Sequence, residues 1–192
     1  MAHVECVVKV GGGLVAHPEL FENSLKIIGA AARDSRLLIV PGGGPFADRV
    51  RTIDSLFRLS DDAAHWMAIS AMDQYGYLIA DRLGGMVVTS RREIAAALTA
   101  DRVPVLAPSN WLHQADPLPH AWTVTSDSIA AWVAGELDVP RLVLVKPPGA
   151  STSDQHIVDE YFDRALQGRV TPIIVPANQQ EALHAALRPV NR

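Results

Sequence analysis

The chain has 192 residues, of which 48% are hydrophobic and 20% charged, and its formal net charge is −4. This composition predicts one globular domain with enough apolar mass for a core. It argues against nucleic acid or an anionic membrane as a partner, because both select a basic face. No apolar run approaches the ~20 residues of a membrane helix, and the N-terminus lacks the features of a signal peptide. We therefore expect a cytoplasmic protein, in which the single cysteine, Cys6, is buried and forms no disulfide.

Strands and helices are expected to alternate along the chain. Apolar, β-branched runs with little alternation predict strands covered on both faces, at Val4–Val10, Leu37–Val40, Met86–Thr89, Val103–Ala107, Leu142–Val145 and Val170–Val175. Helical patterns lie at Glu19–Arg33, Asp61–Leu83, Arg91–Leu98, Asp127–Leu137, Ile157–Leu166 and Gln179–Leu187. This order predicts an α/β fold with a mostly parallel sheet and helices on both faces. Ligands of such sheets bind beyond the carboxyl ends of the strands.

The first predicted strand ends in a lysine and three glycines: Lys9 is followed by Val10, Gly11, Gly12 and Gly13. Burying an ammonium among valines is costly unless an anion meets it. Glycines let backbone N–H groups approach phosphate oxygens without obstruction by a Cβ atom. The segment is therefore a candidate phosphate loop, and the alternative is a tight turn with a lysine that extends to solvent. It is not a P-loop, because no Gly-Lys-Ser/Thr sequence follows.

The same segment also matches the dinucleotide-binding fingerprint, as Gly11-x-Gly13-x-x-Ala16. In that fold an acidic residue near the end of the second strand holds the ribose. Here the second strand ends in Val40 and Pro41. The dinucleotide interpretation is therefore less favoured than a phosphate loop.

A second glycine triplet, Gly42–Gly44, follows the second predicted strand. Two glycine-rich loops on neighbouring parallel strands can face each other across one cleft. One would hold the donor phosphates and the other the acceptor. Arg51 follows on the next helix and is either an anion clamp or an exposed, solvated arginine.

Two further charged residues occupy comparable places in the predicted fold. Asp127 opens a helix after Thr125 and Ser126, and Lys146 ends the strand Leu142–Val145. Asp127 is either part of the helix cap or a carboxylate that orients lysines around a phosphoryl group or holds Mg²⁺ through water. A second lysine at a strand end suits a phosphate cleft.

The longest irregular segment is Pro108–Thr125, and a loop of this length is usually functional. We expect it to close over the acceptor with His120 near the reacting end. His113 and His120 are too far apart in sequence to form a metal pair on one helix face, so no metal site is predicted. On the long helix, Asp73 is expected to face the acceptor pocket, against the alternative of a core or dimer-contact helix.

Together these motifs resemble the amino acid kinase family, which includes acetylglutamate, aspartate, uridylate and isopentenyl phosphate kinases. The motifs are Val8–Gly13, Pro41–Gly44, Thr125–Asp127 and Leu142–Lys146. Within the family, His65–Gly76 and Leu118–Trp132 are similar to a narrower group, the [5-(aminomethyl)furan-3-yl]methyl phosphate kinases of methanofuran biosynthesis.

The resemblance implies a kinase that uses ATP and Mg²⁺ and converts a small phosphorylated acceptor into a diphosphate. It implies roles in phosphoryl transfer for Lys9 and Asp127, donor-phosphate binding by Gly11 and Gly12, and acceptor binding by Gly43 and Gly44. The residues themselves add Lys146, as a substitute for the second catalytic lysine of the family and as a nucleotide-binding residue, and Gly13 in the donor loop. They also add Arg51, Asp73 and His120 on the acceptor side. A homo-oligomer is expected. The chain would comprise an acceptor lobe (1–140) and a nucleotide lobe (141–192), shortened because Lys146-Pro147-Pro148-Gly149 replaces a longer acidic segment of the family. The alternatives are a carboxylate or nucleoside monophosphate acceptor, or a non-catalytic binding or storage protein.

Overall fold

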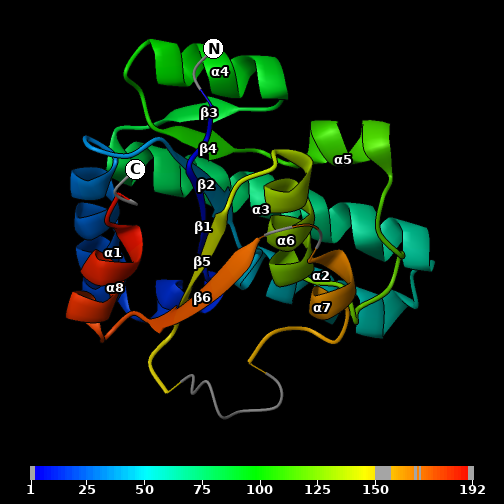
Figure 1. Cartoon of the computed structure of the whole chain (residues 1–192). Coiled ribbons are helices and arrows are strands. Elements are labelled where there is room, and N and C mark those ends of the chain that lie inside the picture. Colours follow the sequence, from blue (N-terminus) through cyan, green and yellow to red (C-terminus); the bar gives the residue numbers. More distant parts are fainter. Residues whose placement is uncertain (1–2, 150–156, 167, 169, 190–192) are drawn as a thin grey trace.

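A computed structural model describes residues 3–149, 157–166, 168 and 170–189. In these residues, six parallel strands form one sheet in the order β3-β4-β2-β1-β5-β6 (Figure 1). The strands are β1 (Cys6–Val10), β2 (Leu37–Pro41), β3 (Met86–Val88), β4 (Pro104–Leu106), β5 (Arg141–Lys146) and β6 (Thr171–Pro176). Each predicted strand is present, and the predicted parallel α/β sheet is confirmed.

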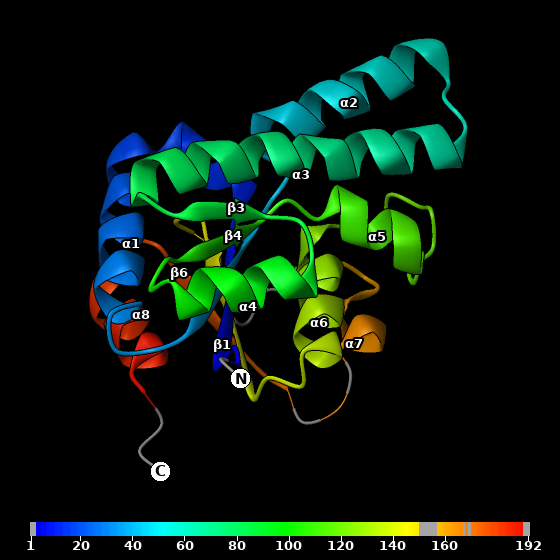
Figure 2. The ribbon, with the colours of Figure 1, turned by 90° about the horizontal axis from the view of Figure 1, so that it is seen from above.

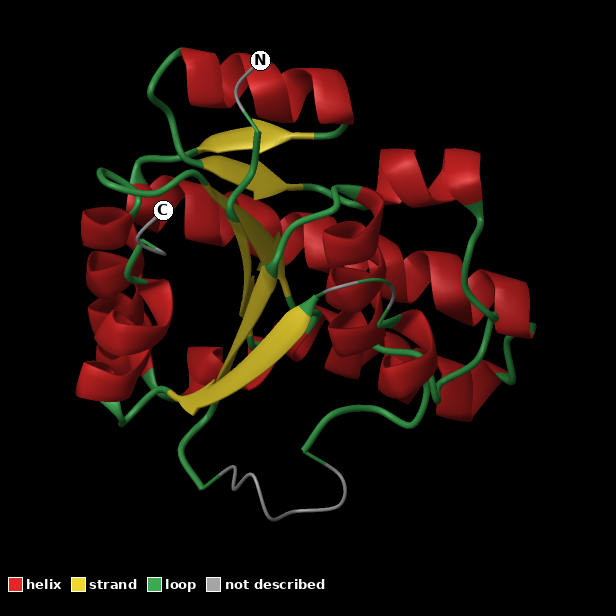
Figure 3. Ribbon diagram, in the orientation of Figure 1, coloured by secondary structure: helices red, strands yellow, loops and turns green. Residues whose placement is uncertain are grey.

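Helices cover both faces of this sheet (Figure 3). They are the 3-10 helix η1 (Gly12–Ala16), α1 (Pro18–Ala31), α2 (Gly44–Phe57), α3 (Asp61–Leu83), α4 (Arg91–Thr99), α5 (Ser109–Ala115), α6 (Ser126–Glu136), α7 (Phe162–Ala165) and α8 (Gln180–Leu187). In Figure 1, α1 and α8 lie on one side of the sheet, and α6 and α7 lie on the other. Among the described residues, no helix has the length and apolarity needed to cross a membrane.

The pleat of the strands decides which layer each side chain joins. On β1, Val8 belongs to the apolar cluster under α1 and α8, whereas Val7 belongs to the cluster under α6. Lys9 has the same parity as Val7 and therefore emerges on the α6 face. On β5, Leu144 also belongs to the α6 cluster, and Lys146 follows at the same parity. Both strand-end lysines are thus directed to the same side of the sheet.

Helix α3 begins and ends where the sequence predicts. The Ser60 hydroxyl accepts a hydrogen bond from a backbone N–H of the first turn, and Gly84 ends the helix with a φ of 66°. Met72 in its middle packs into the α6 cluster, while Tyr75 packs into the other cluster. The helix therefore contributes to both layers, and α2 runs beside it (Figure 2).

Two predicted segments differ from the structure. Pro108–Thr125 is not wholly irregular, because it contains α5. The Asp73 carboxylate of α3 accepts a hydrogen bond from the Ser109 backbone N–H at 3.1 Å, as well as one from the Ser109 hydroxyl. The first turn of α5 is thus capped from another helix, which no local pattern reveals. The predicted helix Ile157–Leu166 is reduced to the single turn α7.

Candidate active site

The two glycine loops are in direct backbone contact. Because β1 and β2 are parallel neighbours, their carboxyl ends lie side by side, with Val10 opposite Pro41. A Cβ atom added to Gly12 would lie 2.1 Å from the Gly44 backbone nitrogen, and one on Gly42 would lie 2.5 Å from the nitrogen of Gly12. Gly44 also has a φ of 56°, which favours glycine. The loops that the sequence places in a common cleft therefore pack against each other, and only glycine fits at their contact.

Lys9, Asp127 and Lys146 form a buried ionic cluster. Lys9 Nζ lies 2.8 Å from Asp127 Oδ1, and Lys146 Nζ donates a hydrogen bond to Asp127 Oδ2 at 2.5 Å. The three residues are only 4%, 4% and 9% exposed, respectively. They come from the ends of β1 and β5 and from the first turn of α6. The pleat brings both ammoniums to the face of the sheet on which α6 presents the carboxylate.

The charges of this cluster do not balance. Burial alone would raise the pKa of the Asp127 carboxyl, but the ammoniums of Lys9 and Lys146 outweigh burial and lower it. The pKa of Lys146 is lowered, first by burial and then by the charge of Lys9. With all three groups ionised, two cations share one anion, and a positive charge remains in surplus. An uncompensated buried charge is costly, so the cluster is suited to a negatively charged ligand.

Asp127 is free for this role because another carboxylate stabilises the start of α6. Asp159 accepts hydrogen bonds from the backbone N–H groups of Thr125 and Ser128, both at 3.0 Å, and from both of their hydroxyls. Thr125 is the N-cap of α6, and its hydroxyl accepts a hydrogen bond from the backbone N–H of Asp127 at 3.4 Å, whereas the Asp127 carboxylate contacts both lysines. Sequence reasoning missed Asp159, because it follows far along the chain in a segment without a motif.

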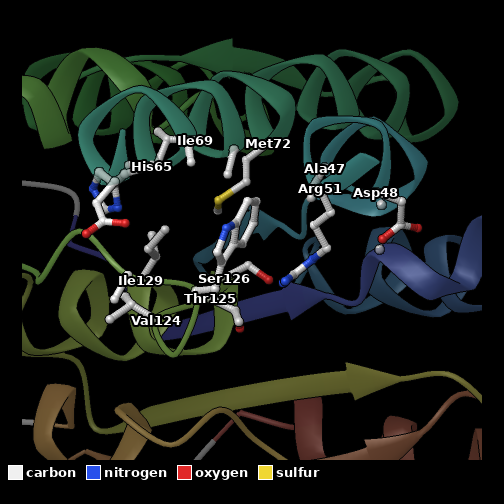
Figure 4. A pocket seen from close by; sticks show the side chains of 18 of the residues that line it. Ala47, Asp48, Arg51, His65, Ile69, Met72, Val124, Thr125, Ser126 and Ile129 are labelled. Atoms are coloured by element: carbon white, nitrogen blue, oxygen red, sulfur yellow. The ribbon is translucent and has the colours of Figure 1, made fainter. Parts of the chain in front are cut away.

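A cavity of about 320 Å³ adjoins the glycine loops. It is lined by both loops, α2, α3, the segment before α6 and the first turns of α6, through Gly12, Gly13, Gly43, Gly44, Ala47, Asp48, Arg51, Asp61, Ala64, His65, Ala68, Ile69, Met72, Ala121, Trp122, Val124, Thr125, Ser126 and Ile129. Figure 4 shows Arg51 and His65 towards opposite ends of the cavity, with the apolar side chains of Ile69, Met72 and Ile129 between them. The cavity therefore has polar ends and an apolar middle.

Arg51 is held in this cavity by an aromatic ring. Its guanidinium lies over the Trp122 ring, 4.1 Å from the centroid. The Trp122 indole N–H donates to Asp54 Oδ2 at 2.7 Å, which fixes the ring. Arg51 is exposed to solvent, and it lines the cavity.

The structure brings only some of the predicted site residues together. Gly12, Gly13, Gly43, Gly44 and Arg51 line the cavity, and the Lys9–Asp127–Lys146 cluster is buried at the same edge of the sheet. Gly11 is engaged with the protein itself: its backbone N–H donates to the Val145 carbonyl at 2.8 Å, and its carbonyl accepts from the Tyr75 hydroxyl at 3.2 Å. Tyr75, which sequence reasoning placed in the core only, therefore also positions the first loop.

Asp73 is not where the sequence interpretation placed it. Its carboxylate is bonded to Ser109, and it is not among the residues that line the cavity. The carboxylates that do line the cavity are those of Asp48 and Asp61. Asp73 was expected there because it lies on the correct helix, but it lies on the side that faces α5.

His120 is not among the residues that line the cavity, and it forms a cluster with His65. Its Nδ1 atom is 2.6 Å from Asp62 Oδ1, and its Nε2 atom is 2.9 Å from Asp116 Oδ1. Its ring stacks on that of His65, with the centroids 4.0 Å apart. The hydrogen bonds to Asp62 and Asp116 raise the pKa of His120, whereas burial, followed by the charge of His120, lowers the pKa of His65 to about 4. His65, and not His120, faces the cavity.

Comparison with known proteins agrees with the features of this site. Residues 5–159 match the sequence profile of the amino acid kinase family. A [5-(aminomethyl)furan-3-yl]methyl phosphate kinase from Methanocaldococcus jannaschii is 28% identical over 168 residues, which are 88% of this chain and 73% of that protein.

Solved structures show the same fold. UMP kinase from Ureaplasma parvum superimposes with a TM-score of 0.71 at 15% identity, over 94% of this chain and 92% of that one. Uridylate kinase from Archaeoglobus fulgidus gives a TM-score of 0.67 at 15% identity, over 94% and 95% of the two chains. The family profile covers most of the chain, including both glycine loops and the Lys9–Asp127–Lys146 cluster. The chain therefore belongs to the amino acid kinase family.

Proposed function

We propose that the protein is a kinase that transfers the γ-phosphate of ATP to a small phosphorylated acceptor and so forms a diphosphate. The observation that carries this proposal is the buried cluster in which Asp127 contacts both Lys9 and Lys146. Its surplus positive charge lies at the strand ends where the two glycine loops meet. The kinase names of the relatives also support the proposal.

The residues present fit the phosphates of ATP. Backbone at Gly12 and Gly13 borders the cavity without a Cβ atom, and the surplus ammonium charge matches a phosphate anion. Both oxygens of Asp127 are in contact with lysines, so Mg²⁺ would be held mainly by phosphate oxygens and water. ATP supplies the phosphoryl group, and Mg²⁺ reduces its charge.

The chain's own contribution to transfer is alignment and charge neutralisation. Phosphoryl transfer needs little covalent chemistry from the protein, but it needs two anions held in line. Lys9, on the central strand, would neutralise charge that develops between donor and acceptor oxygens. Lys146 would bind the donor side, and Asp127 would hold both ammoniums in place. Because these groups are buried, their electrostatic effect is stronger than it would be in water.

The residues that line the cavity support an acceptor with a phosphate, a small ring and a cationic group. At one end, the N-terminus of α2 (Gly43 and Gly44) and Arg51 suit a phosphate, since helix N-termini favour anions. The middle is apolar and suits a small ring. At the other end, Asp61 offers a carboxylate to a cationic group. We propose [5-(aminomethyl)furan-3-yl]methyl phosphate, which has a phosphate, a ring and an amine, as the acceptor.

We also propose a division into two lobes and a homo-oligomeric state. Residues 1–140 would form the acceptor lobe and 141–192 the nucleotide lobe, although β5 lies between β1 and β6 in the same sheet. A homo-oligomer is supported by large apolar side chains that are 64–73% exposed on α2 and α3, namely Leu56, Phe57 and Tyr77. We also propose a cytoplasmic location.

An acceptor panel tests the proposed function. The protein would be incubated with ATP and Mg²⁺ and with the aminomethylfuran phosphate, its analogue without the amine, UMP, or glutamate. ADP release would be measured, and ³¹P NMR would identify a diphosphate product. We expect turnover with the aminomethylfuran phosphate. Turnover with UMP or glutamate alone would support the alternative acceptors.

Nucleotide binding is tested separately by thermal unfolding. A ligand at 100 times its Kd stabilises the folded state by about 2.7 kcal/mol. If neither ATP nor ADP raised Tm and no acceptor gave ADP release, the protein would be a binding or storage protein on the kinase fold.

A further inference from the structure

Three potential metal ligands converge near the end of the cavity that lies away from Arg51. They are His65 from α3, Asp116 at the end of α5 and His120 from the segment before α6. One ligand atom from each lies within 4.8 Å of the other two. Sequence reasoning considered only the pair His113 and His120 and missed the group, because its histidines come from distant parts of the chain.

We propose that His65, Asp116 and His120 bind one divalent transition-metal ion of the zinc type. Two imidazoles and one carboxylate form a ligand set typical of Zn²⁺, Co²⁺ or Ni²⁺, whereas Mg²⁺ and Ca²⁺ prefer oxygen ligands alone. Three protein ligands leave one position of a tetrahedral ion for water or another small ligand. This site is distinct from the Lys9–Asp127–Lys146 cluster and does not depend on the proposed kinase function.

His120 is already oriented as a ligand. Its Nδ1 atom is paired with Asp62 at 2.6 Å, which directs Nε2 towards Asp116. Metal-bound histidines almost always donate their second ring N–H to a carboxylate or a carbonyl. A tetrahedral zinc ion with ligand bonds of about 2.0–2.1 Å separates two ligand atoms by ~3.3 Å. His120 Nε2 and Asp116 Oδ1 are 2.9 Å apart, so a small displacement makes room for the ion.

His65 completes the group from the cavity side. Its ring stacks on that of His120 with an interplanar angle of 18°, so an ion must bind at the edge of the stack. A rotation of the His65 ring about its Cβ–Cγ bond would turn one nitrogen towards His120 Nε2 and Asp116. Because His65 lines the cavity, the fourth position of the ion would face the cavity.

Binding would fasten the segment between α5 and α6 to α3. Asp116 and His120 flank Leu118, which is buried in the α6 cluster, while His65 belongs to the long helix. The ion would replace the hydrogen bond between His120 and Asp116 by coordinate bonds and would add a link to His65. The wall of the cavity around Ala121 and Trp122 would then become more rigid.

Cobalt absorption spectroscopy tests the site directly. The full chain, without a histidine tag, would be titrated with Co²⁺, and we expect visible d–d bands of a tetrahedral ion at one equivalent per chain. Zn²⁺ should displace Co²⁺ and abolish the bands. His65→Gln, Asp116→Asn and His120→Gln should each abolish them, and Asp62→Asn should weaken binding by about 10- to 100-fold.

His113→Gln is the matched control, because His113 stacks on Trp66 and is not in the metal-ligand group. It should bind one equivalent as the wild type does. Circular dichroism would establish that each variant is folded. Zn²⁺ should raise the Tm of the wild type and of His113→Gln, but not that of the three ligand variants. Absence of d–d bands in the wild type would overturn the proposal, and so would Co²⁺ binding by His120→Gln and Asp116→Asn that equals that of the wild type. The three residues would then be a hydrogen-bonded cluster.

Discussion

Lys9 and Lys146, on the adjacent strands β1 and β5, contact opposite oxygens of the Asp127 carboxylate, at 2.8 and 2.5 Å. The charges that remain in the core therefore depend on which of the three residues is removed. Removal of one lysine leaves a buried pair of opposite charges. Removal of the carboxylate takes away the anion that contacts both buried ammoniums, although the charge of Asp159 still acts on Lys146. Activity and stability should therefore respond differently to substitutions within the same cluster.

Lys9→Met should separate catalysis from folding. Methionine fills most of the buried volume, and the Asp127–Lys146 pair remains, so Tm should change little. Loss of one preorganised charge contact should lower kcat by about 10²- to 10³-fold. Lys9→Arg should not restore activity, because the guanidinium is larger and planar. Tm and kcat would be measured on the same preparation, and wild-type kcat in folded Lys9→Met would refute the catalytic role.

Asp127→Asn should destabilise the protein strongly. Breaking a buried ion pair by removing one partner costs about 3–5 kcal/mol, because the remaining charge is uncompensated. For a chain of this size, that corresponds to a Tm lower by roughly 6–20 °C. Thermal unfolding at pH 7 is the measurement. The double variant Lys9→Met/Asp127→Asn is the control and should recover part of the loss, since it leaves one ammonium instead of two.

The stability difference between the wild type and Asp127→Asn should depend on pH. The pKa of Asp127 is lowered below its ordinary value of 3.8, so its stabilising effect is complete above that value and is lost as pH falls through the folded pKa. The two proteins should therefore differ most near pH 7 and converge in strong acid, where the wild-type carboxyl is protonated. Denaturant unfolding at several pH values would measure this, and a constant difference would contradict it.

Gly12→Ala should damage the contact between the two loops. Its Cβ atom would lie 2.1 Å from the Gly44 nitrogen, so one backbone must move. Such overpacking costs about 1–3 kcal/mol. We also expect the stabilisation by ATP to disappear. Gly29→Ala, in the last turn of α1, is the control, because its Cβ would meet only the end of the Leu83 side chain, at 3.2 Å. An equal loss in both variants would show that the effect is not specific to the loops.

Asp61→Asn should change the KM for the acceptor, whereas Asp73→Asn should change the stability of the fold. Asp61 lines the cavity and is exposed, so its loss should raise KM for an amine-bearing acceptor by about 2- to 5-fold, the size expected for an exposed ion pair. Asp73 caps α5 through Ser109, so its loss should cost about 1 kcal/mol of stability and leave KM unchanged. Steady-state kinetics and Tm of both variants test this. A selective KM change in Asp73→Asn would restore the original sequence interpretation.

The elements that sequence patterns predicted well are those that local physics determines. The strands follow from apolar runs, and α3 follows from its apolar spacing, the Ser60 cap and Gly84. The two glycine triplets and the lysines at strand ends mark the site, because glycines and buried lysines lower stability. They are therefore expected where a close backbone contact or an anion requires them.

The features that remained hidden depend on contacts between distant segments. Asp159 stabilises the start of α6, and Asp73 stabilises the start of α5, yet each lies more than 30 residues away in the sequence from the residue that it caps. The pairing of His65 with His120 depends on how the segment after α5 folds back on α3. A single sequence without structure cannot assign such partners, because many acids and histidines satisfy the same local pattern.

The order of the strands also has a consequence for how the chain folds. Lys9 is near the start of the chain on β1, but its counter-ion, Asp127, and the neighbouring strand β5 both follow β2, β3 and β4 in the sequence. During synthesis, β1 therefore lacks a neighbour on one side, and its lysine lacks a counter-ion, until α6 and β5 emerge. Contacts between such distant segments slow folding. A nascent chain that stops before β5 would expose an apolar strand edge, which is a template for aggregation.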